Sequence, residues 1–254
     1  MLHATKKWVA PILAALAMTA LLAPSAQAGF TIAIYENGSA LPAATFTDGG
    51  TGTIQLTGAD INGSLTYFNF LGLTATSTGS TGTPGSNDKA EMTVTVSLDR
   101  QGLGVIDPTG VASIKIVATD DQFSFPSGNP KYMTTSASNT FSNDATDSKR
   151  TFQSTFDNGA SPAVSSALAT FIPTALNLSP GQPDQRTDVG SATTFTLTST
   201  TIITMGPATD GQKIGASSTT KILAVPEPGS MALGLISLPA LLALGRRMRR
   251  RVEA

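Results

Sequence analysis

Hydrophobic and polar residues alternate with a period of two along much of the chain between residues 30 and 224. The most regular example runs from Glu91 to Leu98, where apolar residues alternate with Thr and Ser. Successive side chains of a strand point to opposite faces, so this pattern predicts a half-buried strand. The other runs with strand-like alternation or composition are Phe30–Tyr35, Ala44–Thr47, Thr53–Thr57, Leu65–Ala75, Val111–Thr119, Phe123–Phe125, Lys131–Thr134, Arg150–Phe156, Thr193–Met205 and Ile214–Ala224.

Turn-forming residues separate these runs. Asp48-Gly49-Gly50 predicts a hairpin between the second and third strands, and Asn37-Gly38-Ser39 and Asn62-Gly63-Ser64 are typical of turns. Glycine-rich segments at 76–89 and 99–110 predict loops. The segment Ser161–Phe171 is the one expected short helix, because Pro162 suits a first helical turn. A change of phase near Ile202-Ile203 predicts a bulge or bend there.

About ten to twelve short strands and one short helix predict a single all-β domain over residues 29–224. We expect an antiparallel β-sandwich or jelly-roll-like ectodomain. The chain offers no long amphipathic helices to cover a parallel sheet, which disfavours an α/β fold. It also contains no cysteine, so a hydrophobic core must hold the domain without disulfides.

Residues 1–28 have the pattern of a secretory signal peptide. Lys6 and Lys7 precede an apolar run over residues 9–23, and Ala26-Gln27-Ala28 matches an Ala-x-Ala cleavage site. This interpretation predicts export by the Sec machinery, cleavage by signal peptidase and a mature start at Gly29. An uncleaved membrane anchor is the alternative, which the shortness of the run and the small residues after it disfavour.

The C-terminal segment, residues 225–251, has three parts in a fixed order. The sequence Val225-Pro226-Glu227-Pro228 is a break that cannot continue a strand ladder. An uncharged run of fifteen residues follows from Met231 to Gly245, which is shorter than the roughly 20 that cross a bilayer. A core helix or a re-entrant segment is the alternative interpretation. The positive-inside rule places the last part in the cytoplasm: Arg246, Arg247, Arg249, Arg250 and Arg251.

This order of motif, predicted transmembrane helix and arginine cluster resembles the PEP-CTERM sorting signal of Gram-negative bacterial surface proteins. The resemblance covers residues 225–251 alone. It implies that exosortase, a membrane cysteine protease, cleaves near Pro226-Glu227-Pro228 after a transient stage in the inner membrane. The mature protein would then be retained at the cell surface or in the extracellular matrix, in association with exopolysaccharide.

Composition excludes several classes of function. The only histidine, His3, and the only tryptophan, Trp8, lie in the predicted signal peptide. The predicted mature chain therefore has no base for a Ser-His-Asp or Cys-His nucleophile, and no histidine or cysteine ligand for zinc, copper or haem. Residues 29–224 carry nine Lys and Arg against fifteen Asp and Glu, a net charge of −6. No basic patch for nucleic acid is expected.

Carboxylates remain as candidate site residues. Two pairs stand out, Asp120 with Asp121 and Asp144 with Asp147. Either pair could bind calcium, which takes carboxylate and carbonyl oxygens, but neither has the spacing of an EF-hand. A glycosidase would need two acids across a cleft, which the sequence does not place. The alternative interpretation is that these are solvated turn residues. We therefore assign no catalytic residue and no cofactor, with structural calcium kept as a hypothesis.

These observations lead to the expectation of a non-enzymatic surface or extracellular-matrix protein. The alternative is a carbohydrate-binding or adhesive β-sandwich module. That alternative would be favoured by exposed aromatic residues gathered on one sheet face, and Tyr35, Tyr67 and Tyr132 are the residues that test it.

Overall fold

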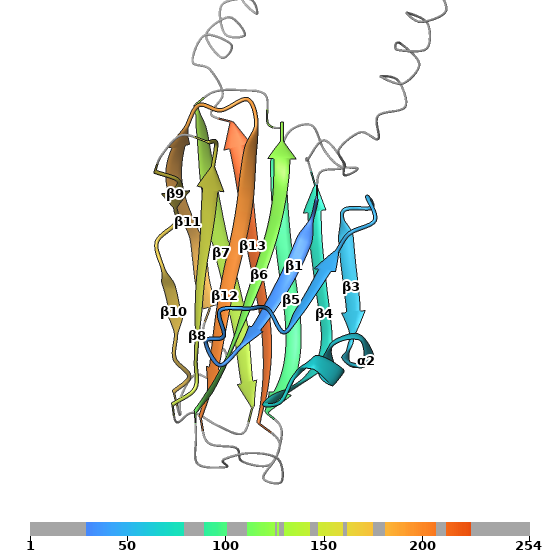
Figure 1. Ribbon diagram of the computed structural model, residues 1–254. Helices are drawn as coiled ribbons and strands as arrows, with labels where there is room; N and C mark the ends of the chain where they lie inside the picture. The colour runs from blue at the N-terminus through green and yellow to red at the C-terminus, as the bar shows by residue number, and fades with distance from the viewer. Residues whose placement is uncertain are drawn as a thin grey trace, which may run out of the picture.

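Two antiparallel β-sheets lie face to face and form a β-sandwich (Figure 1). This computed structural model describes residues 29–78, 89–100, 111–124, 126, 130–142, 147–159, 162–174, 181–206 and 212–224. The predicted all-β sandwich is therefore confirmed. The predicted signal peptide and sorting segment lie outside the described residues. Within the described ranges, no helix combines the length and the apolar character needed to span a bilayer.

Sheet A contains seven of the described strands in the order β10-β8-β12-β6-β1-β2, with β9 beside β8. Their bounds are β1 (Thr31–Glu36), β2 (Ala44–Thr47), β6 (Ala112–Phe123), β8 (Lys149–Asp157), β9 (Val164–Ser165), β10 (Ala169–Phe171) and β12 (Phe195–Met205). Sheet B contains six in the order β11-β7-β13-β5-β4-β3. Their bounds are β3 (Thr53–Thr57), β4 (Phe68–Thr78), β5 (Lys89–Arg100), β7 (Lys131–Ser142), β11 (Gly181–Gly190) and β13 (Lys213–Ala224).

The interior is apolar where β4 and β5 of sheet B face sheet A. Phe195 stacks on Phe123 with ring centroids 5.4 Å apart and packs against Phe156 at 4.7 Å. Each buried side chain of this size contributes roughly 1.5–3 kcal/mol, which allows a core without disulfides. Other fully buried members are Phe30, Ile32, Ile34, Phe68, Phe70, Leu73, Met92, Leu98, Ile114 and Ile116.

The interior between β7 and β13 of sheet B and β8 and β12 of sheet A contains a cluster of polar side chains among apolar ones such as Met133 and Phe152. Ser154 and Thr220 are hydrogen-bonded across the two sheets. Arg150 is 1% exposed, and its Nη1 atom donates to the carbonyl oxygens of Ser138 and Ser217 in the opposite sheet. Hydrogen bonds therefore join the sheets here. The buried polar residues are Thr135, Asn139, Arg150, Ser154, Ser199, Thr201, Ser218 and Thr220.

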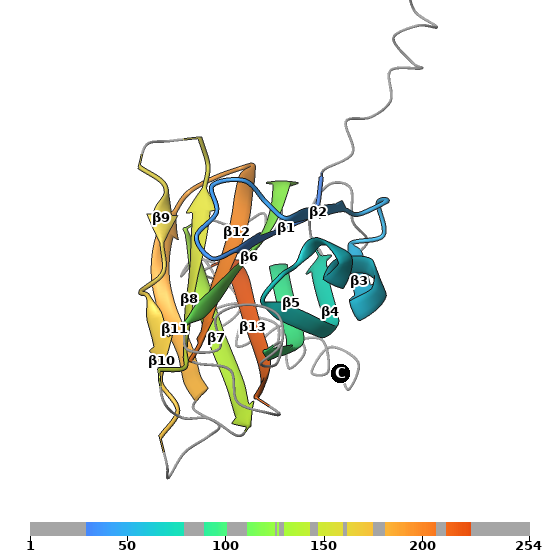
Figure 2. The same cartoon turned by 60° about the horizontal axis from the view of Figure 1, so that its bottom comes forward.

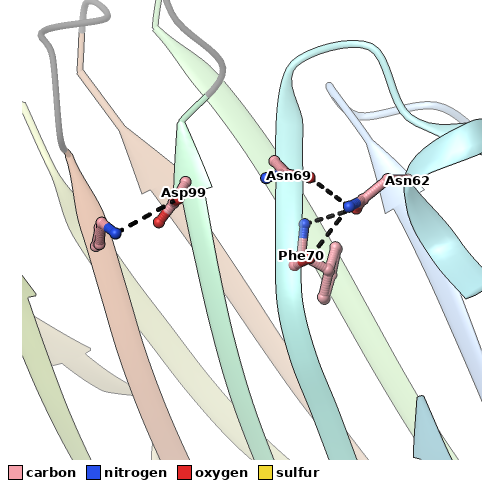
Figure 3. Close-up of polar contacts among 5 residues, drawn as sticks. Asn62, Asn69, Phe70 and Asp99 are labelled. Atoms are coloured by element: carbon pink, nitrogen blue, oxygen red, sulfur yellow. Dashed lines mark hydrogen bonds and ion pairs between the residues drawn. The ribbon is translucent and has the colours of Figure 1, made fainter. Parts of the chain in front are cut away.

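A short helical corner connects β3 to β4. It consists of α2 (Gly58–Ile61) and the 3₁₀ turn η1 (Asn62–Ser64), which lie beside the ends of these strands (Figure 2). Asn62 fixes the corner to β4, because its Oδ1 accepts from the Phe70 amide at 2.7 Å and its Nδ2 donates to the Phe70 carbonyl at 3.1 Å. Nδ2 also donates to Asn69 Oδ1 (Figure 3). The predicted turn at Asn62 is thus a structural anchor.

Three sequence predictions are wrong or incomplete. The expected helix at Ser161–Phe171 contains strands β9 and β10, which pair with β8. Buried Ala169 and Phe171 flank exposed Thr170, which is a strand pattern too short to recognise in the sequence. The strand β11, which pairs with β7 alone at the sheet edge, was not predicted because its polar sequence shows no alternation of apolar residues. The corner helix α2 was also missed, although Thr57 and Asp60 form a capping box.

The predicted bulge near Ile202-Ile203 is also wrong. The register of β12 with β6 is continuous through these residues, and its shift lies between Phe195 and Leu197. The apparent change of phase arises because Thr201 points inward and is 3% exposed, whereas Ile202 points outward. With a polar residue inside and an apolar residue outside, the sequence shows the same change of phase as a bulge would.

Candidate binding face

The outer face of sheet B is covered by hydroxyl side chains. The strand register aligns them in two rows that run across five strands. One row is Thr53, Thr76, Thr93, Thr219 and Ser136, and the next is Gln55, Thr74, Thr95, Ser217 and Ser138. We call these ten residues, nine with a hydroxyl group and one the amide Gln55, the hydroxyl face. They arise because alternate residues of each strand point away from the core.

Neighbouring hydroxyls of the hydroxyl face are hydrogen-bonded to one another. The Oγ1 atoms of Thr93 and Thr219 lie 3.1 Å apart, and Thr95 Oγ1 lies 3.2 Å from Ser217 Oγ. Each hydroxyl has one donor and two acceptor sites, so such a pair keeps unused positions for an external partner. Strand geometry spaces the hydroxyls by about 4.8 Å across strands and about 6.7 Å along them.

A shallow depression of about 410 Å³ lies in the hydroxyl face beside the edge strand β11. The residues that line it are Ser136, Ala137, Ser138, Gly181, Ser217, Ser218 and Thr219. Gly181 forms the margin at the first residue of β11, where the absence of a side chain leaves the space open. The depression is open and lies among Ser and Thr residues, unlike an enclosed pocket for a small molecule.

Ion pairs border the hydroxyl face. Glu91 is 3.7 Å from Lys221, and Asp99 is 3.8 Å from Lys213. Figure 3 shows Asp99 near the C-terminal end of β5. On the edge strand, Arg186 is 3.6 Å from its neighbour Asp188. Surface pairs of this kind contribute at most about 1 kcal/mol to stability. Their importance here is that each of these three cations has an acid beside it.

The three tyrosines do not form one aromatic platform. Tyr35 lies on β1 of sheet A, where Lys115 Nζ is 3.9 Å from the ring centroid. Tyr132 lies on β7 of sheet B, with the Arg186 guanidinium 4.0 Å over its ring. Tyr67 precedes β4 and is contacted by Arg100 at 5.7 Å. The aromatic cluster that would favour a sugar-stacking module is therefore not formed by these residues.

The acidic pair Asp120 and Asp121 does not converge on one point. Asp120 points inward, is fully buried and is hydrogen-bonded to the Ser77 hydroxyl. Asp121 is partly exposed and accepts a hydrogen bond from the Gly29 amide at 2.9 Å. Asp147 is exposed with a positive φ of 59°, which is turn geometry, and Asp144 lies outside the described residues. Within the described ranges, no group of three or more His, Cys, Asp or Glu residues could hold a metal ion.

The hydroxyl face was not predicted from the sequence. The alternating Thr and Ser residues of Glu91–Leu98 were visible there, but the rows exist only once the strand order is known. The buried position of Arg150 was not predicted either, because an isolated arginine in a strand normally lies in solvent.

No protein-family model matches this chain, and no curated protein matches it. Among solved structures, one described as TmCBM61 in complex with β-1,4-galactotriose aligns with it at a TM-score of 0.27 and 9% identity. The alignment covers 76% of this chain and 88% of that chain. A likeness of this level carries no argument about the ligand of this protein.

Proposed function

We propose that this chain is an exported, non-enzymatic protein of the bacterial surface or extracellular matrix. In this proposal the β-sandwich binds uncharged polysaccharide of the matrix through the hydroxyl face. The observation that carries the proposal is the alignment of Thr and Ser hydroxyls in rows over five strands of one sheet.

The chemistry of the hydroxyl face suits a sugar polymer. Polysaccharides present repeated hydroxyl groups that both donate and accept hydrogen bonds, and the rows of this face repeat the same groups. An extended, shallow surface fits a polymer chain better than an enclosed small molecule. The paired charges at the border favour an uncharged polymer over an acidic one, since Arg186, Lys213 and Lys221 each already have a carboxylate beside them.

The expected affinity is low for a single contact. Each hydrogen bond replaces one to water and contributes about 0.5–1.5 kcal/mol net. The three tyrosines supply no stacking platform to increase it. Retention in the matrix would then depend on many copies binding one polymer, which raises the effective affinity without new contacts.

Delivery in this proposal follows the two terminal segments. Sec export and signal peptidase would release a chain that begins at Gly29, and exosortase would remove the segment after Pro226-Glu227-Pro228. The support for this part is the sequence pattern of residues 1–28 and 225–251. Intact mass of the protein from the host, with and without the sorting protease, tests it. A product that retains Met231–Arg251 in both hosts would contradict it.

A binding experiment with matched variants tests the hydroxyl face. The secreted protein is titrated with neutral polysaccharide from the host matrix by affinity electrophoresis, as wild type and as T93V/T219V. Valine keeps the shape and strand propensity of threonine but removes both hydroxyls. We expect binding about five- to tenfold weaker, from the loss of one or two hydrogen bonds.

The matched control is T119V/T198V on the outer face of sheet A. There the two Oγ1 atoms also form a cross-strand pair, at 3.4 Å. This variant should bind within twofold of wild type. Equal losses in both variants, or no binding of neutral polysaccharide by the wild type, would contradict the proposal. Little change in binding between low and moderate salt is also expected, since the partner is uncharged.

A further inference from the structure

The first described residue is held against the side chain of Asp121. The Gly29 amide donates to Asp121 Oδ1 at 2.9 Å, across 92 positions of sequence. The contact follows from the pairing of β1 with β6, which sets Thr31 opposite Thr119. Phe30 is fully buried, and its carbonyl accepts from the Asp48 amide at 2.8 Å. The backbone is therefore fixed in position up to Gly29.

No cation accompanies the Asp121 carboxylate in the described part of the chain, where the Gly29 amide is its hydrogen-bond donor. Asp121 lines a surface hollow at this end of sheet A. Asp157 of β8 and Thr196 of β12, the strand between β8 and β6, line the same hollow. Asp48 belongs to the turn that contacts Phe30. These carboxylates give the surroundings of Gly29 a negative charge, and a positive charge at Gly29 would complement them.

We propose that removal of residues 1–28 creates this charge and completes an ion pair between the new Gly29 α-ammonium and Asp121. Hydrolysis of the Ala28–Gly29 peptide bond consumes one water and leaves a carboxylate on Ala28 and an ammonium on Gly29. A hydrogen bond from a neutral amide to the Asp121 carboxylate thereby becomes an ion pair between an ammonium and that carboxylate. The inference rests on the cleavage site in the proposed export route.

The consequence is that processing stabilises the folded domain. A precursor that still carries its leader has only the hydrogen bond from the uncharged Gly29 amide, and the remaining stability appears after the leader is removed. The ammonium is the charged form of the α-amino group, which titrates near pH 8 in the unfolded chain. An ion pair raises that pKa in the folded state, so the gain is complete below about pH 7.5 and is lost as the pH rises through the folded value.

The test compares three forms of residues 29–224: a free Gly29 terminus, the same terminus with enzymatic Nα-acetylation, and an extended form beginning at Ala26. Acetylation removes the charge but keeps the N–H donor, so it isolates the ion pair. We expect the free form to have a folding equilibrium constant roughly fivefold larger than the acetylated form, and a Tm about 2–4 °C higher. The extended form should behave like the acetylated one.

The variant D121N is the control, since it keeps an oxygen acceptor and removes the negative charge. In D121N the free and acetylated forms should unfold at the same urea concentration, and in wild type their difference should disappear at pH 10. Equal stability of free and acetylated wild-type protein, or a difference that persists in D121N, would overturn the inference.

The failure of this inference and that of the proposed function are distinguishable. N-terminal sequencing of the exported protein shows whether the host cleaves before Gly29, whatever the outcome of the comparison in vitro. The hydroxyl face lies on sheet B, and Asp121 lies on β6 of sheet A. Polysaccharide binding by D121N should therefore equal that of wild type.

Discussion

The guanidinium of Arg150 provides the sharpest test of how this sandwich is held together. It reaches from β8 to the opposite sheet and makes four hydrogen bonds. Nη1 donates to the carbonyls of Ser138 and Ser217 at 2.9 and 3.0 Å and to Asn139 Oδ1 at 2.6 Å. Nη2 donates to Thr201 Oγ1 at 3.3 Å. The rings of Phe152 and Phe171 lie 5.7 and 5.8 Å from the charge.

Burial lowers the pKa of Arg150 to about 10, so the group is charged at neutral pH but less favourably than in water. This shift means that burial disfavours the charge by about 3 kcal/mol. The sign follows from proton binding. Between pH 10 and the ordinary pKa of arginine, the unfolded chain binds more protons than the folded chain. The free energy of unfolding therefore rises with pH in this range, and below pH 10 the full cost of burying the charge is present. The hydrogen bonds must offset this cost.

The variant R150A removes the charge and its cost, but it also removes the donor of four hydrogen bonds to buried acceptors. Asn139 is 4% exposed, so water does not readily replace this donor, and the loss of a buried hydrogen bond costs about 1–3 kcal/mol. The truncation also leaves a cavity beside Phe152 and Phe171. We expect a loss of about 3–5 kcal/mol in the free energy of unfolding, measured by urea denaturation followed by far-UV circular dichroism. The exposed control R186A should lose less than about 1 kcal/mol.

A second variant separates charge from packing. R150M fills most of the volume but still removes the Arg150 donor from Asn139 Oδ1, whereas R150M/N139L removes that acceptor as well. Apolar replacement of a complete buried polar pair is often neutral. The double variant should therefore be more stable than R150M by about 1–2 kcal/mol. If R150A costs less than about 1 kcal/mol, or if N139L adds to the loss of R150M, the polar interior does not stabilise the sandwich in the way argued.

Two further predictions concern the corner and the first hairpin. In G58A the new Cβ would lie 2.3 Å from the Phe70 carbonyl oxygen, so we expect a loss of about 1–3 kcal/mol, while G63A, with no atom within 4 Å, should be nearly neutral in the same urea assay. Burial opposes the charge of Asp48, but hydrogen bonds from the Thr51 hydroxyl and three backbone amides outweigh it and lower its pKa. Its contribution, at most about 1 kcal/mol at this exposed turn, is present above pH 3.8 and lost as the pH falls through the lower folded value. Urea midpoints from pH 6 to 2.5 should fall more steeply for wild type than for D48N, and parallel curves would contradict this account.

Sequence alternation predicted the strands that have an apolar inner face. Glu91–Leu98 lies within β5, and the strands at 44–47 and 53–57 match β2 and β3. The same rule underestimated β7, because Thr135 and Asn139 occupy inner positions and only the start at Lys131 looked like a strand. It also missed β11, a polar strand at the edge of sheet B. Alternation of hydrophobic and polar residues identifies strands that face an apolar core, and the core of this protein is partly polar.

The candidate sites depended on contacts that no local pattern encodes. The hydroxyl face needs the order β11-β7-β13-β5-β4-β3, which joins residues from Thr53 to Thr219. The Gly29–Asp121 contact joins a predicted cleavage site to a residue that the sequence suggested as a calcium ligand. The residue types were visible beforehand, and their partners were not.

The polar half of the core also raises the question of what fixes the strand register. In β13 the inner residues Ser218 and Thr220 are chemically like the outer residues Ser217 and Thr219. A slip by one position would exchange these faces at little hydrophobic cost in this stretch. Such a slip would, however, remove the carbonyl of Ser217 from Arg150 and leave a buried cation with fewer acceptors. We therefore expect R150M/N139L to retain most of its free energy of unfolding but to hold a single strand register less strictly than wild type. Amide hydrogen exchange in β13 and β7 should be faster relative to global unfolding in that variant than in wild type, and unchanged exchange would show that the apolar half alone sets the register.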